Sequence, residues 1–499
     1  MNNSTDKNQR SCPLEALVDA IKPLSTCGYT RPDTEITHVT ADSRQCGPGT
    51  LFTAVRGVAV DGHRFIQAAI AAGATAIVAE ELPDDLPEGV AAFTVADTRE
   101  ALGLLASRFF GEPSDELTLV GVTGTNGKTT IATLLYELAR LRGLKAGLLS
   151  TVANCIDGER IPADHTTPDP VLLNELLRRM VDAGCTFAAM EVSSHAADQK
   201  RIAGLTFAGG IFTNITRDHL DYHKTFDAYL KAKKSFFDNL PAEAFALTNA
   251  DDRNGAVMLQ NTPARRFSYS TRDVADFHVR LVEDRIDGML IETEGRQIET
   301  MFTGAFNASN LAAVYGAASL LGVPSDELAV LMSRLVPVAG RFQPFRSPDG
   351  VTAIVDYAHT PDALVNVLDT IADVASRDSR VITVCGAGGN RDKGKRPIMA
   401  KVAADRSSVL ILTSDNPRHE DPETILDEME AGLTPDGRER TKRITDRREA
   451  IREAVRIANP GDIILIAGKG HETTQTIGDT DHHFDDREEV SRAFEELRK

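Results

Sequence analysis

Residues 121–130 read Gly-Val-Thr-Gly-Thr-Asn-Gly-Lys-Thr-Thr, a glycine-rich turn that ends in a lysine and two threonines. The short apolar run 117–120 precedes it and predicts a β-strand, whereas apolar residues at helical spacing over 131–141 predict a helix that Gly143 ends. Backbone N–H groups and the helix dipole favour phosphate at such a helix N-terminus. The stretch therefore predicts an α/β fold that binds a nucleotide triphosphate.

The side chains at the end of the turn fit the same ligand. Lys128 can reach the terminal phosphates, and the Thr129 hydroxyl suits Mg²⁺. The pattern is a variant, because the first glycine of the common P-loop would fall at Val122, and glycines stand instead at 121 and 124. A glycine turn without a ligand is the competing interpretation, and the strand, lysine, hydroxyls and helix together disfavour it.

Length and composition limit the number of domains and the kinds of partner that the chain can have. The 499 residues are enough for about three domains of roughly 150 residues each. A formal net charge of −18 argues against nucleic acid as the main partner, and six cysteines without a CxxC pair predict reduced thiols. The N-terminal stretch lacks an apolar signal segment, and no run is long and apolar enough to span a bilayer. We expect a cytoplasmic monomer that acts on small molecules and contacts no membrane.

The chain divides into three predicted domains. Residues 1–115 mix short strands and helices around polar turns, and a surface turn is the competing interpretation of each polar cluster there. Residues 116–343 contain the nucleotide turn, and residues 344–499 alternate apolar strands with helical stretches. The predicted fold class is α/β, with a central P-loop ATPase-like parallel sheet domain and a C-terminal Rossmann-like domain.

Two predicted strands of the central segment end on residues suited to a metal. The run 187–190 leads to Glu191, and the run 210–213 leads to Asn214 and, five residues later, to His219. In an open α/β sheet, ligands bind beyond the carboxyl ends of the strands. Because hard cations prefer oxygen ligands and accept an occasional imidazole, we expect Glu191 and His219 to bind Mg²⁺ beside the nucleotide.

The C-terminal segment contains one arrangement four times: an apolar predicted strand followed by a polar loop. The strands are expected at 351–355, 381–384, 409–412 and 462–466. Their loops carry Arg391 and Arg418, which suit a carboxylate, and Asp415 and Glu472, which suit an ammonium group. A site with both signs of charge predicts a zwitterionic amino acid as the ligand, with solvated loop charges as the competing interpretation.

A nucleotide site, metal ligands and an amino-acid site in one chain fit amide-bond formation driven by ATP. Transfer of the γ-phosphoryl group to a carboxylate gives an acyl phosphate, which a neutral amine can attack with phosphate as the leaving group. Positioning and cationic stabilisation supply most of the acceleration in phosphoryl transfer. Lys128, with Mg²⁺ on Thr129 and Glu191 and a second cation near His219, would stabilise the charge.

Taken together, these motifs resemble the Mur ligases of peptidoglycan precursor synthesis over nearly the whole chain. The segments that carry the resemblance are GTNGKTT at 124–130, TTP at 166–168, EVSSH at 191–195, TNITRDHLDYH at 213–223, YAHTP at 357–361, GNRDKGKRP at 389–397, DNPR at 415–418 and GKGHE at 468–472. The resemblance implies three domains that bind UDP-N-acetylmuramoyl-L-alanyl-D-glutamate, ATP and the incoming amino acid, respectively. It also implies a role in cell-wall biogenesis, and hence in cell shape, cell division and the cell cycle.

The resemblance assigns residues to each substrate. The UDP-sugar peptide would contact Ser43, Asp61, Gly62, His63, Thr166, Thr167, Ser193, Gln199 and Arg201. ATP would contact Gly124, Thr125, Asn126, Gly127, Lys128, Thr129, Thr130, Asn310 and Arg341. The amino acid would contact Arg391, Asp415, Asn416, Pro417, Arg418, Gly468 and Glu472. The DNPR segment implies meso-diaminopimelate, because its second amino-acid centre needs Asn416 and Arg418.

The family also carries a carbamylated lysine that bridges metal ions, and the matching position is Lys233. The catalytic set implied is then Lys128, Glu191, His219 and Lys233, and the metal ligands are Thr129, Glu191, His219 and Lys233 as its carbamate. Carbamylation requires a neutral amine, so burial or neighbouring cations must lower a pKa that starts near about 10.4. Lys231 and Lys234 lie close by in sequence, and a solvated helix face is the competing interpretation.

Several alternatives remain at this stage. An L-lysine-adding relative and a folylpolyglutamate synthase-like ligase share the same chemistry, and a P-loop small-molecule kinase or a catalytically silent nucleotide-binding module shares the nucleotide turn. The chain also departs from the family pattern at 196–198, which reads Ala-Ala-Asp, and at Asn390, where an aspartate is expected before Arg391.

Overall fold

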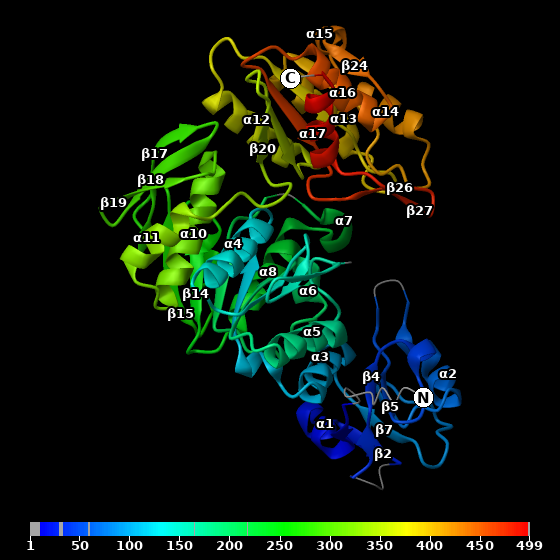
Figure 1. Cartoon of the computed structure of the whole chain (residues 1–499). Coiled ribbons are helices and arrows are strands. Elements are labelled where there is room, and N and C mark those ends of the chain that lie inside the picture. The colour runs from blue at the N-terminus through cyan, green and yellow to red at the C-terminus, as the bar shows by residue number, and fades with distance from the viewer. Residues whose placement is uncertain (1–9, 29–32, 58–59, 164, 217, 498–499) are drawn as a thin grey trace, which may run out of the picture.

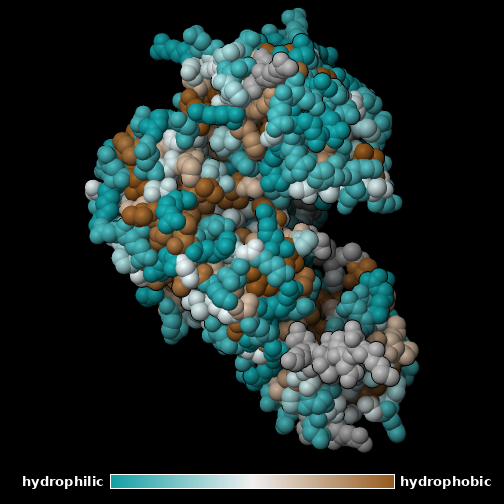
Figure 2. Space-filling view, in the orientation of Figure 1, coloured by the Kyte–Doolittle hydropathy of each residue, from teal (hydrophilic) through white to brown (hydrophobic). Residues whose placement is uncertain are grey.

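The chain folds into three α/β units that follow one another in sequence (Figure 1). This computed structural model describes residues 10–28, 33–57, 60–163, 165–216 and 218–497, so that residue 217 of the 213–223 motif lies outside the described part. The N-terminal and C-terminal units lie at opposite ends of the central one. The space-filling view shows the surface indented on the side where the units approach one another (Figure 2).

The central unit is built on a nine-stranded sheet in which neighbouring strands pair in parallel, except for the two strands at one edge, whose pairings are antiparallel. Its order is β11 (Glu159–Ile161), β10 (Asn154–Ile156), β9 (Ala146–Leu149), β12 (Phe187–Glu191), β8 (Thr118–Thr123), β13 (Gly209–Phe212), β14 (Phe245–Asn249), β15 (Arg265–Ser270) and β16 (Phe277–His278). A separate antiparallel sheet joins β17 (Arg280–Arg285), β18 (Gly288–Thr293) and β19 (Arg296–Thr300). The central strands β12 and β13 are buried throughout, and β8 is buried apart from Thr118, as near-continuous apolar runs predict.

Helices cover both faces of the central sheet. One face packs against α4 (Lys128–Leu141), α10 (Ala305–Leu320) and α11 (Ser325–Ser333), and the other against α5 (Pro170–Asp182), α8 (Phe226–Asp238) and α9 (Gly255–Met258). The strand expected at 117–120 continues to Thr123, because Val122 pairs with Glu191 of β12 and Thr123 pairs with Phe212 of β13. This register brings the nucleotide turn, Glu191 and the residues after β13 to the same edge of the sheet.

The N-terminal unit contains a five-stranded sheet of order β2 (Ser25–Cys27), β7 (Ala91–Thr94), β6 (Ala76–Ala79), β5 (Thr50–Thr53) and β4 (His38–Thr40). Helices α1 (Leu14–Ile21) and α3 (Thr98–Phe109) cover one face, and α2 (Ile66–Ala71) covers the other. A two-stranded pair, β1 (Cys12–Pro13) and β3 (Glu35–Ile36), lies beside it. Asp97 caps α3 by accepting from the backbone N–H of Arg99 and Glu100, which fixes where this helix begins.

The C-terminal unit contains a six-stranded sheet of order β20 (Gln343–Arg346), β21 (Thr352–Asp356), β25 (Ile463–Ala467), β22 (Val381–Cys385), β23 (Val409–Leu412) and β24 (Thr441–Arg443). Helices α12 (Pro361–Val374), α13 (Lys395–Arg406) and α14 (Pro422–Glu430) cover one face, and α16 (Arg447–Ile457) and α17 (Asp486–Leu497) the other. The short helix α15 (Pro435–Glu439) and the hairpin of β26 (Thr474–Ile477) and β27 (Thr480–His483) complete it. All four strands expected from the sequence are present and mutually parallel.

The predicted α/β fold class is confirmed, with a central P-loop sheet domain and a C-terminal Rossmann-like domain. The predicted boundary after residue 115 falls within the short 3₁₀ helix Pro113–Glu116. The boundary after residue 343 falls inside β20, which pairs with β21, so we propose that the C-terminal domain begins in the connection just before β20. Among the described residues, no helix is long and apolar enough to cross a membrane.

A buried ion pair ties two helices of the C-terminal unit to the strand end that carries the GKGHE loop. Arg447, at the start of α16, donates from Nε and Nη2 to the carboxylate of Asp486, at the start of α17, at 2.8 and 2.7 Å. Arg447 Nη2 also donates to the carbonyl of Ala467, the last residue of β25, at 3.0 Å. Both side chains are 0% exposed, so each charge depends on the other.

We expect the variant Asp486→Ala to destabilise the C-terminal unit by about 3–5 kcal/mol, because it leaves the Arg447 guanidinium buried without a counter-charge. Urea unfolding followed by circular dichroism and by hydrogen exchange of β25 measures the loss. The control is Glu496→Ala, which removes the exposed partner of Arg452 at 3.6 Å and should cost less than about 1 kcal/mol. Equal effects of the two variants would contradict the role given to the buried pair.

Candidate active site

The nucleotide turn lies between β8 and α4 and has the shape of a phosphate cradle. Gly124 and Gly127 have φ angles of 152° and 87°, which favour glycine. A Cβ at position 124 would stand 1.8 Å from the hydroxyl of Thr213, so this position admits no side chain. Lys128 Nζ donates to the carbonyls of Gly124 and Thr125 at 3.1 and 2.9 Å, and burial lowers the pKa of this ammonium.

The residues after β13 hold the turn in place from the neighbouring strand. The backbone N–H of Thr125 donates to the carbonyl of Asn214 at 2.8 Å, and that of Asn126 donates to the Asn214 side chain at 3.0 Å. Thr213 Oγ1 donates to the carbonyl of Asn126 at 2.6 Å. The nucleotide turn is therefore fixed before any phosphate binds, which reduces the entropy cost of binding.

Glu191 ends β12 with its carboxylate buried beside the turn. Its Oε1 accepts from the backbone N–H of Thr151 at 2.7 Å, while Oε2 is buried and has no hydrogen-bond partner among the described residues. A buried carboxylate oxygen that lacks a donor costs free energy unless a cation or donor approaches it. This orphaned oxygen fits the Mg²⁺ ligand that the sequence predicts at Glu191.

The oxygen donors near the turn suit magnesium bound together with phosphate. Thr129, at the start of α4, is buried and accepts from Arg341 Nη2 at 3.2 Å. Within the described ranges, no cluster of three or more His, Cys, Asp or Glu side chains is arranged to hold a metal ion alone. Mg²⁺ commonly takes one or two carboxylates and completes its shell with water and substrate phosphates, so the donor set fits.

Lys233 is the lysine of its segment that reaches the nucleotide turn. It is 1% exposed, and its Nζ donates to the carbonyl of Gly124 at 2.6 Å. Burial, reinforced by the charge of Lys128, lowers the pKa of the Lys233 ammonium well below its usual value. Lys231 instead pairs with Asp227 on the exposed face of α8, and Lys234 pairs with Asp238.

His219 lies after β13, just before the short helix α7 (Leu220–His223), with a φ angle of 53°. Its ring is exposed and lies 5.0 Å from the ring of His195 and 6.0 Å from that of Tyr229, between centroids. Its Nε2 is 3.5 Å from the carboxylate of Asp218. The structure therefore brings His219 to the edge of the sheet that carries Glu191 and the turn.

Asn310 and Arg341, which are also expected to contact ATP, come from different parts of the chain. Asn310 of α10 packs against the turn so closely that a Cβ on Gly127 would meet its Oδ1 at 2.5 Å. Arg341 follows α11 and places its guanidinium 4.5 Å from the ring centroid of Tyr357, in the C-terminal unit. Because Arg341 also donates to Thr129, it connects the nucleotide helix α4 to the C-terminal unit.

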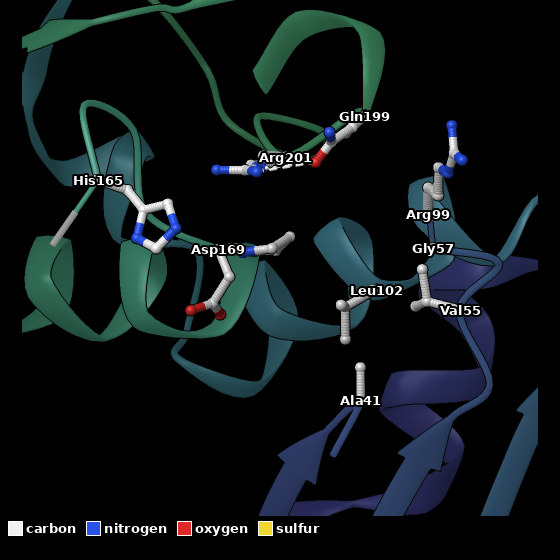
Figure 3. A pocket seen from close by; sticks show the side chains of 10 residues that line it. Ala41, Val55, Gly57, Arg99, Leu102, His165, Asp169, Gln199 and Arg201 are labelled. Atoms are coloured by element: carbon white, nitrogen blue, oxygen red, sulfur yellow. Dashed lines mark hydrogen bonds between the residues drawn. The ribbon is translucent and has the colours of Figure 1, made fainter. Parts of the chain in front are cut away.

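A cavity of about 240 Å³ lies between the N-terminal unit and the central one. We call it the acceptor cavity, because two residues expected to contact the UDP-sugar peptide acceptor line it. Figure 3 shows the two walls facing each other. The N-terminal wall contains Ala41, Val55, Gly57, Arg99 and Leu102, and the central wall contains His165, Asp169, Pro170, Gln199 and Arg201. Of the residues expected to contact the UDP-sugar peptide, Gln199 and Arg201 therefore line one common cavity.

The central wall of this cavity is a hydrogen-bonded network. Arg201 donates from Nε and Nη2 to the Gln199 amide oxygen and from Nη1 to the carbonyl of Thr167 at 2.8 Å. The Thr167 hydroxyl donates to the carbonyl of Glu191 at 2.8 Å, and Thr166 accepts from Thr151 at 3.0 Å. Ser193 caps the helix α6 (Ser194–Asp198). These residues connect the acceptor cavity directly to the strand end of Glu191.

The expected contacts in the N-terminal unit do not line the cavity. Ser43 begins a short 3₁₀ helix, and Asp61 caps another by accepting from the backbone N–H of His63 at 3.0 Å. His63 uses both ring nitrogens internally, Nδ1 with Asp61 at 2.7 Å and Nε2 with the backbone N–H of Glu80 at 3.0 Å. A Cβ on Gly62 would meet the carbonyl of Val55 at 2.6 Å. These contacts give the Asp61–His63 turn a structural role, and its contact with substrate stays a prediction.

The residues expected to bind the amino acid gather beyond β23 and β25. Asn416 Nδ2 donates to Glu472 Oε2 at 2.8 Å, and a Cβ on Gly468 would stand 3.1 Å from Asp415 Oδ2. Arg418, with a φ angle of 52°, donates to the carbonyl of Gly389 at 2.9 Å, and a Cβ on Gly389 would meet the Pro417 carbonyl at 1.9 Å. Arg391 is exposed on the adjoining loop and makes no side-chain hydrogen bond to a described residue.

The structure also places residues at the site that the sequence reasoning left out. The ammonium of Lys469 lies within hydrogen-bonding distance of Asn416 and Glu472. The sequence signal for this residue was its place in the GKGHE motif. The β26–β27 hairpin reaches the DNPR loop, where Gln475 donates to the carbonyl of Asp415 at 2.7 Å. Arg99 of α3 also lines the acceptor cavity, and no sequence motif indicates that this helix reaches it.

Both departures from the family pattern are accommodated locally. Asp198 accepts from the hydroxyl of Tyr222 at 2.7 Å, and the same hydroxyl accepts from Gln199 Nε2 at 3.1 Å, so this aspartate supports the acceptor wall. Asn390 has a φ angle of 54°, which asparagine tolerates well, and its side chain accepts from the backbone N–H of His419 at 3.2 Å.

Family models cover most of the described chain. The Mur ligase family catalytic domain matches residues 35–110, the Mur ligase middle domain matches 122–318, and the Mur ligase glutamate ligase domain matches 340–470. A Bacteroides fragilis protein called UDP-N-acetylmuramoyl-L-alanyl-D-glutamate--2,6-diaminopimelate ligase is 56% identical over 96% of this chain and 99% of its own length. The Parabacteroides distasonis protein of the same name is 58% identical over the same shares.

Solved structures agree with this assignment. A structure described by the same ligase name aligns with a TM-score of 0.69 at 34% identity and covers 94% of this chain and 97% of its own. The Thermotoga maritima MurF ligase in complex with ADP shares the fold, with a TM-score of 0.61 at 19% identity over 92% of this chain and 97% of its own. The resemblance carried by the sequence motifs is confirmed, and this chain belongs to the Mur ligase family.

Proposed function

We propose that this chain is an ATP-dependent ligase that joins meso-diaminopimelate to the D-glutamate of UDP-N-acetylmuramoyl-L-alanyl-D-glutamate. The observation that carries the proposal is the convergence of three sites in one chain: the phosphate cradle, the acceptor cavity that leads to Glu191, and a loop cluster with both signs of charge. The names and identities of the relatives support the same substrates. Arg341, between Thr129 and Tyr357, connects the nucleotide and amino-acid sites.

The reaction runs in two steps. An oxygen of the glutamate side-chain carboxylate attacks the γ-phosphorus of ATP, ADP leaves, and an acyl phosphate forms. A neutral amine then attacks the carbonyl carbon, the bond to the phosphate oxygen breaks, and the nitrogen loses a proton to give an amide and inorganic phosphate. Lys128 would neutralise phosphate charge at the cradle, and the backbone N–H groups of the turn would orient the γ-phosphoryl group.

We propose Mg²⁺ as the metal, with Thr129, Glu191, His219 and the Lys233 carbamate as its protein ligands. When bound, Mg²⁺ would offset the negative charge that the phosphates bring together. The carbamate would form when the neutral Lys233 amine attacks carbon dioxide and releases one proton. The lowered pKa of Lys233 supports this step, because burial beside Lys128 favours the neutral amine that carbamylation requires.

At the amino-acid site, the loop charges would orient the incoming amine. Arg418 and Arg391 suit the carboxylate of the distal amino-acid centre, and Asp415 and Glu472 suit its ammonium group. The other amine of the substrate then remains available for attack. The net charge of −18 and the small-molecule substrates also fit our proposal of a cytoplasmic monomer that binds no nucleic acid or membrane.

The proposal predicts strict dependence on the amine. With ATP and the UDP-sugar dipeptide, the purified chain should release ADP at least about 10²-fold more efficiently with meso-diaminopimelate than with L-lysine. The reason is that lysine has no carboxylate beside its distal amino group, where the arginines would bind one. A coupled ADP assay measures kcat/KM for each amine. Equal rates with lysine, or rapid ADP release without any amine, would contradict the proposed function. A folate acceptor in a parallel reaction tests the folylpolyglutamate alternative.

The acyl phosphate makes an isotopic prediction. If the acceptor carries oxygen-18 in its glutamate side-chain carboxyl group, one labelled oxygen should appear in each inorganic phosphate released, because the carboxylate oxygen forms the bond to phosphorus. Mass spectrometry of the phosphate measures the transfer. Amide product without labelled phosphate contradicts this route, and a stable phosphorylated acceptor would instead favour the kinase alternative.

Replacement of Lys233 tests its proposed carbamate. The variant Lys233→Ala should lower kcat by about 10²-fold, since it removes one carboxylate from the metal site, and short-chain carboxylic acids should restore part of the rate. Lys231→Ala is the matched control on the same helix, because Lys231 is 73% exposed and pairs with Asp227. A loss at position 231 that equals the loss at 233, or a failure of every added carboxylate to rescue Lys233→Ala, would argue against the carbamate.

A further inference from the structure

Lys469 occupies the centre of the amino-acid site. It follows β25, between Gly468 and Gly470, and its side chain is 0% exposed. Its Nζ donates to Asn416 Oδ1 at 2.9 Å and to Glu472 Oε2 at 3.1 Å, and lies 3.8 Å from Asp415 Oδ1. One internal ammonium group therefore lies among the polar side chains that the site offers to a substrate.

The loop that carries Lys469 has little freedom to move. Gly470 has a φ angle of 54°, and a Cβ there would stand 2.7 Å from the carbonyl of Gly340 and 2.8 Å from the Cβ of Tyr357. On the other side, Gly468 follows the strand end that Arg447 anchors through the carbonyl of Ala467. The backbone on both sides of Lys469 is therefore fixed, and the ammonium stays inside the site.

Asn416 links Lys469 to the other polar groups of the pocket. Its Oδ1 accepts from Lys469 and from the backbone N–H of Thr476 in β26 at 3.1 Å, while its Nδ2 donates to Glu472 Oε2. Its amide group is thus engaged by protein groups at both ends. Lys469 and Asn416 together hold the Glu472 carboxylate through the same oxygen.

Lys469 adds a positive charge to the inner pocket, where Lys395 is a further cation that interacts with the Asp415 carboxylate. Asp415 and Glu472 carry two negative charges, while Arg418 and Lys469 carry two positive charges. The neighbouring cation Arg447 is matched by Asp486, and Arg391 is exposed on the outer loop. Charges of both signs complement a head group with one carboxylate and one ammonium, whereas loss of Lys469 makes the pocket more negative and so favours a lone ammonium.

We propose that Lys469 is a positioning and specificity-determining residue for the amine substrate. Its ammonium holds Glu472 and Asn416 in one geometry and sets the pocket to receive a zwitterionic head group in preference to the single ammonium of a diamine side chain such as that of lysine. This inference rests on the proposed function, because it concerns the choice between the two amines. Lys469 acts through Glu472, without contact with the reacting atoms.

Steady-state kinetics of Lys469→Met, with each of the three substrates varied in turn, test the proposal. We expect KM for meso-diaminopimelate to rise at least about tenfold, because a hydrogen-bonded charge that orients Glu472 is lost, while KM for ATP and for the acceptor changes less than about twofold. The ratio of kcat/KM for diaminopimelate to that for L-lysine should fall at least about tenfold. Lys401→Met, on an exposed lysine of α13 that pairs with Asp405, is the control.

A double variant separates action through Glu472 from general damage. If Lys469 works through Glu472, adding Lys469→Met to Glu472→Gln should change KM for the amine less than about twofold beyond Glu472→Gln alone. Multiplicative effects, an unchanged KM for the amine, or a parallel rise in all three KM values would overturn the proposal. Where Lys469→Met does not fold, as judged by circular dichroism, Lys469→Gln is measured in its place, since it keeps a donor for Asn416 and removes the charge.

The two proposals fail in different ways. If the unchanged chain does not join diaminopimelate to the acceptor, the proposed function is wrong, and the Lys469 inference falls with it. If the unchanged chain performs the reaction but the Lys469 variants keep its KM and its preference over lysine, the proposed function stands and the role of Lys469 is wrong.

Discussion

The ammonium groups of the buried Lys233 and the half-buried Lys128 meet at one carbonyl oxygen, that of Gly124, and the active site depends on this contact. Lys128 Nζ lies 3.1 Å and Lys233 Nζ 2.6 Å from that oxygen. Burial lowers the pKa of both ammonium groups, and for Lys233 the charge of Lys128 lowers it further. Phosphate would stabilise the charge on Lys128, while a carbamate would replace the positive charge of Lys233 with a negative one. Under the proposed function, the same contact would favour a charged Lys128 at the nucleotide and a modified Lys233.

This pair of lysines is possible because the backbone beneath them is fixed by sheet geometry. The parallel register of β8, β12 and β13 brings the turn, Glu191 and Asn214 to one edge, where their polar groups satisfy one another. The C-terminal unit reaches the same edge through a close backbone contact, since a Cβ on Gly340 would lie 2.1 Å from the carbonyl carbon of Gly470. Arg341 follows Gly340 directly and extends from Thr129 to Tyr357. The proposed function assigns phosphoryl transfer to the central domain and binding of the amine to the C-terminal domain. Both would therefore take place at the boundary between these two domains.

Much of the fold could be predicted from local pattern. The nucleotide turn and helix α4, the strand ends at Glu191 and before Asn214, and the four parallel strands of the C-terminal domain follow from apolar runs and glycine placement. The extension of β8 to Thr123 and the pairing of β20 with β21 could not be predicted, because neighbouring strands distant in sequence set them. At the site, Gln199 and Arg201 reach the acceptor cavity, whereas the turn at Asp61 and His63 is engaged in its own structural contacts.

The sequence by itself determined the family, the order of the three domains and the chemical character of each loop, because those depend on residue types at fixed local spacing. Tertiary structure alone decided which lysine of the segment 231–234 is buried against Gly124, since all three share one helix and differ only in the side that faces the sheet. It also decided that Lys469 lies between Asn416 and Glu472 and that Arg99 faces Arg201 across a cavity. Such contacts join elements far apart in the chain, and only packing brings them together.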